Sequence, residues 1–201
     1  MINFFGEMLM DYIIRTKVGS RKIRAVKPSV VFDVLSRLDR YIGSRRKRRS
    51  WEERRFLVSF LFFTGLRASE AILVKRRDLN IAARTLNAPT LKQSKKRREV
   101  YYILISLSHV PDDELGYWEQ YLAGKNYDDF ILGIRTRYGI WKAVHEVFAR
   151  FGYEGVYPHM LRHSIAIFLA SNNVPLNVLQ RLLRHSDPKN TAIYYAITAS
   201  D

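Results

Sequence analysis

The sequence predicts an α+β fold that is mostly α, with a small antiparallel β-sheet. Apolar residues recur at the three- and four-residue spacing of amphipathic helices along most of the chain. Residues 79–106 instead alternate apolar and β-branched positions around a polar turn at 93–96, which indicates a β-hairpin. Because 47% of the 201 residues are hydrophobic, the chain can bury a substantial core, and global disorder is disfavoured.

The helical segments can be placed from their apolar spacing. Helices are expected over residues 30–42, 51–66, 68–74, 113–122, 138–151, 160–172 and 176–183, and from residue 191 onward. Ser50 and Glu53 have the spacing of a capping box, which would start the second of these helices.

The N-terminal part of the chain has a weaker pattern. Residues 4–14 are apolar and are expected to form a short helix, whereas residues 15–24 are basic and polar. Lys27-Pro28-Ser29 is typical of a boundary before a helix. We therefore expect an N-terminal extension or remnant linker at 1–27 and one main domain at 28–201.

The charge balance indicates a polyanionic partner. Lys and Arg number 34 against 19 Asp and Glu, which gives a net charge of +15 and an isoelectric point near 10.2. An excess of this size costs self-repulsion, so nucleic acid is the first candidate and an anionic membrane surface the second. The membrane ranks last among the readings because no helix concentrates basic residues opposite a bulky apolar face.

The composition excludes several classes of site. The chain contains no cysteine, so disulfide frameworks, cysteine-based zinc sites and thiol nucleophiles are absent. Apolar runs such as 60–63 are far too short to span a bilayer, and no secretory signal is apparent. A cytoplasmic location is expected.

Clusters of basic residues are candidates for contact with phosphates. The first cluster has a solvated loop as its alternative reading, at about even odds, and the others flank the motifs described below. The candidates are Arg45, Arg46, Lys47, Arg48, Arg49, Lys75, Arg76, Arg77, Lys95, Lys96 and Arg184.

Five short segments carry the residues of a possible catalytic site. In order they are Thr64-Gly65-Leu66-Arg67-Ala68-Ser69-Glu70, a lysine-bearing hairpin around Lys92, His159-Met160-Leu161-Arg162-His163, Leu182-Leu183-Arg184-His185-Ser186 and Thr191-Ala192-Ile193-Tyr194. Each residue alone has an ordinary explanation, such as a surface pair between Arg67 and Glu70. Their order and contexts together favour a catalytic set.

These segments resemble the tyrosine recombinase family of phage integrases and Xer-type recombinases, over roughly residues 28–197. The resemblance is most specific in residues 159–194, where the nine-residue step from His185 to Tyr194 also matches. It implies the catalytic-domain fold of that family. It also implies a site-specific recombinase or integrase that cleaves and rejoins duplex DNA through a covalent 3′-phosphotyrosine intermediate, for example in viral genome integration.

The resemblance implies that two arginines and two histidines bind the scissile phosphate. Cleavage of a phosphodiester develops charge on the nonbridging oxygens, and the forked donors of Arg67 and Arg162 suit that charge. His159 and His185 would donate to the phosphate or handle the proton of the tyrosine. We expect Glu70 to orient an arginine, and His163 to pack behind the site.

For the nucleophile and for the general acid, the sequence offers two nearby candidates each. Tyr194 is the expected nucleophile, with Tyr195 as the competitor. Lys92 is the expected general acid for the leaving 5′ oxygen, with Lys95 as the alternative, because the hairpin is one residue longer than usual. No metal, nucleotide or other cofactor is expected, since the phosphotyrosine ester keeps the bond energy needed for rejoining.

The chain departs from the usual family pattern at both ends. The 27 residues before Pro28 are too few for the core-binding domain that commonly precedes the catalytic domain, so either this is a fragment or it holds DNA with one half. The residues after Tyr194 include one sizeable aliphatic side chain, Ile197, whose burial is worth only roughly 1.5–3 kcal/mol. We therefore expect a monomer in solution and a tetramer on DNA.

Two other functions remain open at this point. One is DNA strand cleavage and religation of the type IB topoisomerase kind, which shares the chemistry. The other is a DNA-binding regulator without catalysis, descended from an integrase. Each fits a cytoplasmic, nucleoid-associated protein encoded by a virus or mobile element.

Overall fold

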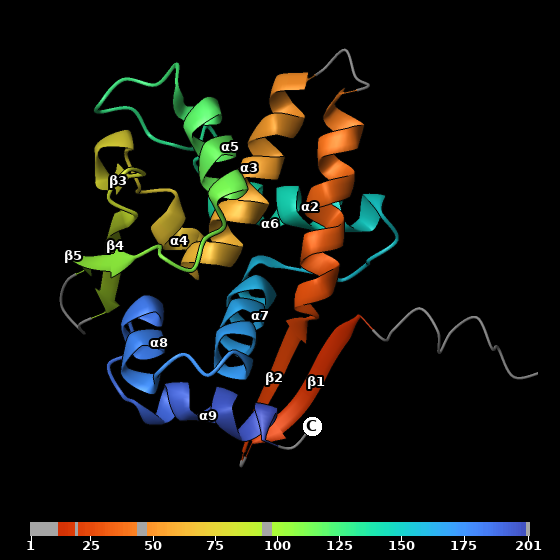
Figure 1. Cartoon of the computed structure of the whole chain (residues 1–201), viewed down its shortest axis with the longest axis vertical. Coiled ribbons are helices and arrows are strands. Elements are labelled where there is room, and N and C mark those ends of the chain that lie inside the picture. The colour runs from red at the N-terminus through yellow and green to blue at the C-terminus, as the bar shows by residue number, and fades with distance from the viewer. Residues whose placement is uncertain (1–11, 19, 44–47, 94–97, 200–201) are drawn as a thin grey trace, which may run out of the picture.

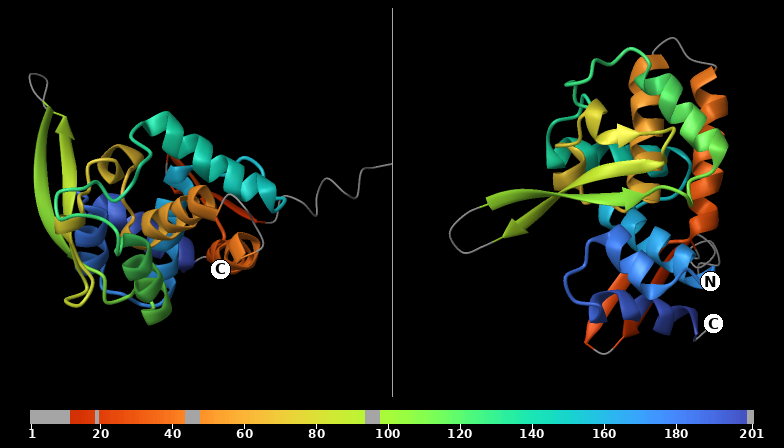
Figure 2. Two further views of the ribbon diagram at one scale, coloured as in Figure 1. Left: turned by 90° about the horizontal axis from the view of Figure 1, so that it is seen from above. Right: turned by 60° about the vertical axis from the view of Figure 1, so that its left-hand side comes forward.

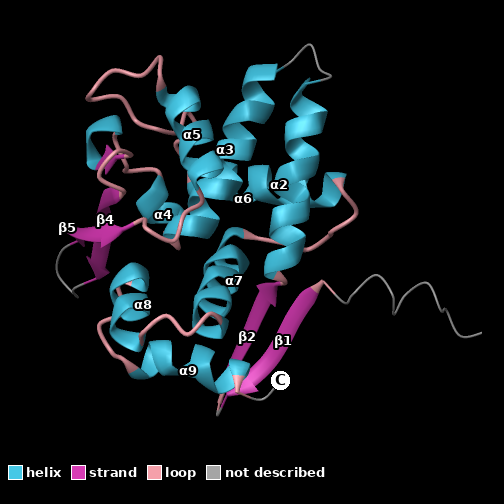
Figure 3. Cartoon of the chain, in the orientation of Figure 1, coloured by secondary structure: helices cyan, strands magenta, loops and turns pink. Residues whose placement is uncertain are grey.

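The computed structural model describes residues 12–18, 20–43, 48–93 and 98–199. Its elements are β1 (Ile13–Val18), β2 (Arg21–Val26), α2 (Pro28–Gly43), α3 (Arg48–Thr64), α4 (Ala68–Ala71), η1 (Arg76–Asp78), β3 (Leu79–Asn80), β4 (Thr85–Gln93), β5 (Arg98–Ser106), α5 (Asp112–Leu122), α6 (Arg137–Arg150), α7 (Pro158–Ser171), α8 (Leu176–Leu183) and α9 (Lys189–Thr198). Helices form most of the molecule (Figures 1 and 3), which confirms the expected α+β, mostly α fold.

The predicted hairpin within residues 79–106 is present as β4 and β5. These strands pair antiparallel from Thr85 opposite Ser106 to Gln93 opposite Arg98, and the short β3 adds a third strand beside β4. The hairpin extends away from the helices (Figure 2). Its turn, residues 94–97, lies outside the described residues.

A second, two-stranded sheet near the N-terminus was not predicted. β1 and β2 form an antiparallel hairpin in which Ile13 lies opposite Val26. The short helix expected over 4–14 is therefore wrong at Ile13 and Ile14, and its residues 4–11 lie outside the described part of the chain. The strand forms because its partner β2 packs against α7, where Ile23 and Ala25 are buried.

The core is built around α3 and α7. Phe56, Leu57 and Phe60 of α3 are fully buried. α7 packs against α2, α3, α6, α8, α9 and β2, so its residues are positioned from several sides at once. None of the described helices is long and apolar enough to cross a membrane.

The start of α3 differs from the capping box expected at Ser50 and Glu53. The helix begins at Arg48, so Ser50 lies inside it. The carboxylate of Glu53 instead accepts hydrogen bonds from the backbone N–H groups of Gly133 and Ile134. Glu53 therefore fastens α3 to the segment before α6, a long-range contact that a local motif does not indicate.

A buried ion pair joins α2, α3 and α5. The Arg55 guanidinium donates to both oxygens of Glu114, at 2.6 and 2.7 Å, and to Asp39. Ser59 donates to Glu114 as well, and the Trp118 indole donates to Ser59 at 2.8 Å. Both Arg55 and Glu114 are largely removed from water, so loss of one partner would leave a buried charge with incomplete compensation.

We predict that Glu114→Ala lowers the free energy of unfolding by about 3–5 kcal/mol, because the Arg55 charge stays buried without its bidentate partner. Urea or thermal unfolding measures this. Asp112→Ala is the matched control on the same helix, because Asp112 pairs with Arg84 while 88% of its side chain is exposed. That variant should lose about 1 kcal/mol or less. Equal losses in the two variants would contradict the prediction.

Candidate active site

A cavity of about 350 Å³ lies among α7, α9, β2 and the segment that follows α3. Its lining residues are Lys22, Ile23, Arg67, His159, Arg162, His163, His185, Asn190, Ile193 and Tyr194. None of these is acidic, whereas several are basic. A larger cavity of about 1170 Å³ adjoins it between the β4–β5 hairpin and α8, and shares Arg67 and His185. The smaller cavity is the candidate site because Tyr194 lines it.

Arg162 is held rigidly at one wall of the cavity. Its guanidinium donates to the carbonyl oxygens of Gly65 and Leu183, and only 1% of the residue is exposed. Burial, together with the neighbouring charges of Arg67 and Arg184, lowers the pKa of Arg162 to about 9. The group stays cationic at neutral pH, and these two bonds leave further N–H donors of the fork for a ligand.

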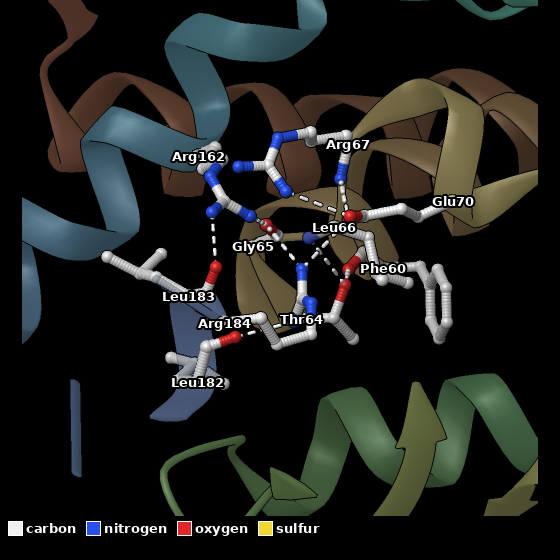
Figure 4. A network of polar contacts seen from close by, with 10 residues as sticks. All are labelled: Phe60, Thr64, Gly65, Leu66, Arg67, Glu70, Arg162, Leu182, Leu183 and Arg184. Carbon is white, nitrogen blue, oxygen red and sulfur yellow. Dashed lines mark hydrogen bonds and ion pairs between the residues drawn. The ribbon is translucent and has the colours of Figure 1, made fainter. Parts of the chain in front are cut away.

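Glu70 positions Arg67 beside Arg162, as Figure 4 shows. The Glu70 carboxylate accepts from the Arg67 backbone N–H at 2.8 Å and from its guanidinium at 2.9 Å. Burial alone would raise the pKa of Glu70, but Arg184 and Arg67 outweigh it and the pKa is lowered. Glu70 therefore remains ionised, while the Arg67 side chain stays partly exposed to receive a ligand.

Arg184, which we expected to contact DNA, has its side chain inside the protein. Its side chain is fully buried and donates to Glu70 at 3.0 Å, to Gly65 at 3.2 Å and to Leu182. Arg184 has a positive φ of 54°, which ends α8 and turns the side chain inward. The inward turn replaces a surface position by an internal ion pair, and DNA contact by Arg184 stays a prediction.

Gly65 is the point at which the two buried arginines meet. Its carbonyl oxygen accepts from both Arg162 and Arg184. Its φ is +57°, and a Cβ at this position would lie 3.1 Å from a methyl carbon of Leu183. Glycine is therefore required here both by the backbone conformation and by the close approach of α8.

Tyr194 and Tyr195 point to different places. Tyr194 is 1% exposed, and its hydroxyl lies 2.8 Å from Nδ1 of His163. The hydroxyl of Tyr195 instead donates to the carbonyl of Val174, in the segment between α7 and α8. Of these two tyrosines, only Tyr194 lines the cavity.

Two further histidines complete the wall. Nδ1 of His185 lies 2.9 Å from the Thr191 hydroxyl, and its ring is nearly parallel to that of Tyr194 at a centroid distance of 6.5 Å. The Thr191 contact fixes the ring, so Nε2 is the nitrogen that can serve a ligand. His159 packs its ring against that of His163, at 4.5 Å between centroids.

The predicted general acid lies on the β4–β5 hairpin. Lys92 is paired with Glu99 in the strand register, and its side chain is outside the described part of the structure. Lys95 and Lys96 also lie outside it. The choice between Lys92 and Lys95 therefore stays a prediction.

Of the first basic cluster, only Arg49 has a described side chain, and it is exposed near the start of α3. Arg45, Arg46 and Lys47 fall outside the described residues, as does the side chain of Arg48.

The second basic cluster, Lys75, Arg76 and Arg77, forms ion pairs and a hydrogen bond within the protein. Lys75 and Arg77 form ion pairs with Asp128, and Arg76 donates to the carbonyl of Leu79 at 2.9 Å. A phosphate at this place would have to compete with Asp128. DNA contact by these three residues remains a prediction.

Comparison with known proteins identifies the family. The sequence model described as "Phage integrase family" matches residues 35–200. The chain belongs to the phage integrase family. The match includes Arg67, Arg162, His185 and Tyr194, which the fold brings to one cavity.

Relatives of this phage integrase family chain include named recombinases. It is 31% identical to tyrosine recombinase XerD of Listeria innocua serovar 6a over 157 residues. That alignment covers 71% of this chain and 49% of the relative. The chain is 28% identical to tyrosine recombinase XerA of Pyrococcus furiosus, with 72% and 50% covered. The chain thus spans about half the length of the curated relatives it matches.

Solved structures support the same phage integrase family fold. The crystal structure of XerA recombinase superimposes with a TM-score of 0.64 at 20% identity, over 89% of this chain and 61% of that one. The catalytic domain of bacteriophage HP1 integrase gives 0.55 at 17% identity, with 88% and 89% covered. At these identities the likeness shows the fold alone.

Among the cavity residues that sequence reasoning did not place there, His163 and Lys22 are the two with ionisable side chains. We expected His163 to pack behind the site, yet it contacts the Tyr194 hydroxyl directly. The four-residue step from His159 to His163 puts both on one face of a helix, and this signal was available in the sequence. Lys22 had no such signal, because its position depends on the packing of β2 against α7.

No group of three or more His, Asp or Glu side chains among the described residues is arranged to hold a metal ion. The histidines instead adjoin the two arginines. Burial, with His159 and Arg162 nearby, lowers the pKa of His163 to about 3. Burial, with Arg162 and Arg67 nearby, lowers the pKa of His185 to about 3. Both rings are therefore neutral at neutral pH, and each has one unprotonated nitrogen that can accept a hydrogen bond.

These lowered pKa values predict how stability changes with pH. In the unfolded chain, His163 and His185 take up protons as the pH falls through about 6.5. In the folded chain they do so only near pH 3. The unfolded state binds more protons between these values, so the free energy of unfolding should decrease as the pH falls from about 6.5 toward 3.

Urea titrations at a series of pH values measure this slope. The double variant His163→Asn, His185→Asn removes both titrating groups and should flatten the slope, whichever absolute stability it has. An unchanged slope in the double variant would assign the effect to other groups.

Proposed function

We propose that this chain is the catalytic part, at residues 28–201, of a site-specific tyrosine recombinase that cleaves and rejoins duplex DNA through a covalent 3′-phosphotyrosine intermediate. The observation that supports this most directly is the 2.8 Å contact between the Tyr194 hydroxyl and a neutral His163, inside a cavity that also presents Arg67 and Arg162. The names of the curated relatives agree with it.

The cavity would hold the scissile phosphate by charge. Arg67 and Arg162 supply forked N–H donors to the nonbridging oxygens, and their positions are fixed by Glu70 and by backbone carbonyls before the substrate arrives. His159 and His185 add neutral donors at the cavity wall. Donors fixed in advance stabilise the developing charge without reorganising.

Cleavage would follow in a single displacement. The Tyr194 oxygen attacks phosphorus while its proton passes to Nδ1 of His163, which requires the tautomer with hydrogen on Nε2. The P–O bond to the 5′ oxygen breaks, and Lys92 is the proposed donor of a proton to that oxygen. The reverse reaction rejoins the strand, because the phosphotyrosine ester conserves the bond energy and needs neither nucleotide nor metal.

The alternatives share parts of this proposal. A type IB topoisomerase would use the same chemistry, but the relatives are named recombinases. A regulator without catalysis would have no need for a buried tyrosine hydroxyl paired with an imidazole. Integration, excision and resolution use the same cleavage and joining steps, so these residues would serve viral or mobile-element DNA and chromosomal DNA alike.

We further propose a monomer in free solution, acting on DNA in the cytoplasm and assembling as a tetramer there. Support comes from α9, which packs against α7 and α8 of its own chain. Ile197 is only 5% exposed, so its side chain is already buried in its own chain and is not available to a neighbour. Sedimentation without DNA tests this, and a tight dimer would contradict it.

Tyr194→Phe should abolish the covalent adduct with DNA while leaving DNA affinity nearly unchanged, because the variant lacks the attacking oxygen and keeps the ring. The assay uses a library of nicked duplexes of random sequence, in EDTA and without nucleotide, with adducts detected on a denaturing gel.

Tyr195→Phe is the matched control, since its hydroxyl contacts the Val174 carbonyl outside the cavity. It should retain adduct formation. Adduct from Tyr194→Phe, or its loss only in Tyr195→Phe, would overturn the assignment.

Arg67→Ala and Arg162→Ala should each slow single-turnover cleavage by about a hundredfold to a thousandfold, the scale of losing one preorganised donor. Arg67→Lys should restore little, because a lysine cannot reproduce the fork that meets both Glu70 and the phosphate. Since Arg162 is also structural, circular dichroism must first show that its variant folds. Near-normal rates in folded variants would remove these residues from the mechanism.

A further inference from the structure

The β1–β2 hairpin is fixed to the same helix that carries His159, Arg162 and His163. β2 packs along α7, and the Ser164 hydroxyl lies 2.6 Å from the carbonyl oxygen of Val26. At the base of the hairpin, the Tyr12 hydroxyl donates to the Glu154 carbonyl at 2.6 Å. These contacts make the hairpin a positioned part of the domain.

One face of this hairpin is basic. In the strand register, Lys17 lies opposite Lys22 and Arg15 lies opposite Arg24. Directly opposed residues share a face of the sheet, and all four are exposed. The other face carries Ile23 and Ala25, which are buried.

Opposed like charges destabilise a two-stranded sheet. Lys17 and Lys22 form such a pair, and the hairpin has no third strand among the described residues. In water alone the repulsion between the opposed lysines would only destabilise the hairpin. A polyanion bound along this face would instead make the same charges stabilising.

The basic face continues into the active-site cavity. Lys22 lines that cavity together with Arg67, Arg162 and Tyr194. In Figure 1 the β1–β2 hairpin and the β4–β5 hairpin lie on opposite sides of α7, α8 and α9. The helices that carry the cavity residues are thus flanked by a hairpin on each side.

We propose that the basic face of β1–β2, formed by Arg15, Lys17, Lys22 and Arg24, binds the DNA backbone next to the scissile phosphate, with Lys22 nearest to the reaction. This rests on the proposed function. The position of Lys22 in the cavity favours DNA over an anionic membrane, because a flat bilayer cannot enter a site of about 350 Å³ beside Tyr194.

The first test measures the salt dependence of binding to a duplex of mixed sequence. The double variant Lys17→Gln, Lys22→Gln should lower the slope of log K against log salt by about two, one for each lost phosphate contact. The control Lys125→Gln, Lys142→Gln removes the same charge from α6 and from the turn after α5. It should leave the slope unchanged.

The second test separates Lys22 from its neighbour. At saturating nicked duplex, Lys22→Gln should slow single-turnover adduct formation by about tenfold or more, since it removes a charge at the cavity. Lys17 does not line the cavity, so Lys17→Gln should weaken binding and slow this step less than Lys22→Gln does. Lys142→Gln on α6 is the control that should leave the rate near normal.

The outcomes distinguish failure of this proposal from failure of the proposed function on which it rests. If wild type forms no adduct, the proposed function fails. If wild type forms adduct and the hairpin double variant matches its control in salt slope, the hairpin proposal alone is refuted. Loss of binding to phosphatidylserine vesicles without loss of DNA binding would also refute it, in favour of a membrane.

Discussion

The carbonyl oxygen of Gly65 and the carboxylate of Glu70 are the two acceptors on which the site depends. Between them they hold Arg67, Arg162 and Arg184, which come from segments far apart in the chain. Burying guanidiniums is costly unless they are hydrogen-bonded. The packing of α8 against the turn after α3 supplies those bonds. The contacts that stabilise the fold are therefore the same ones that position the site.

The same cluster explains the chemistry. Three guanidiniums around one carboxylate leave uncompensated positive charge beside the cavity, which suits an anionic ligand. Burial, together with that charge, also holds His163 and His185 neutral. A bound phosphate would offset the positive charge and raise these pKa values, so the anionic ligand itself would strengthen the imidazole as a base.

Helical spacing predicted the helical fold, and the resemblance to the tyrosine recombinases pointed to the residues that share the cavity: Arg67, His159, Arg162, His185 and Tyr194. Features set by packing between distant segments were beyond the sequence. Arg184 was interpreted as a surface charge because the neighbouring residues give no signal for the left-handed turn that buries its side chain. Lys22 reaches the cavity only because β2 packs on α7, and a weak alternation at residues 13–18 was obscured by the apolar stretch before it.

The burial of Tyr194 has a consequence for the lifetime of an intermediate. With 1% of the residue accessible, an ester formed on its oxygen would sit where bulk water has little access. Hydrolysis would then compete poorly with attack by a DNA hydroxyl held in the cavity. A broken strand could wait for its partner without being lost as an irreversible nick, so fidelity of joining would come from exclusion of solvent.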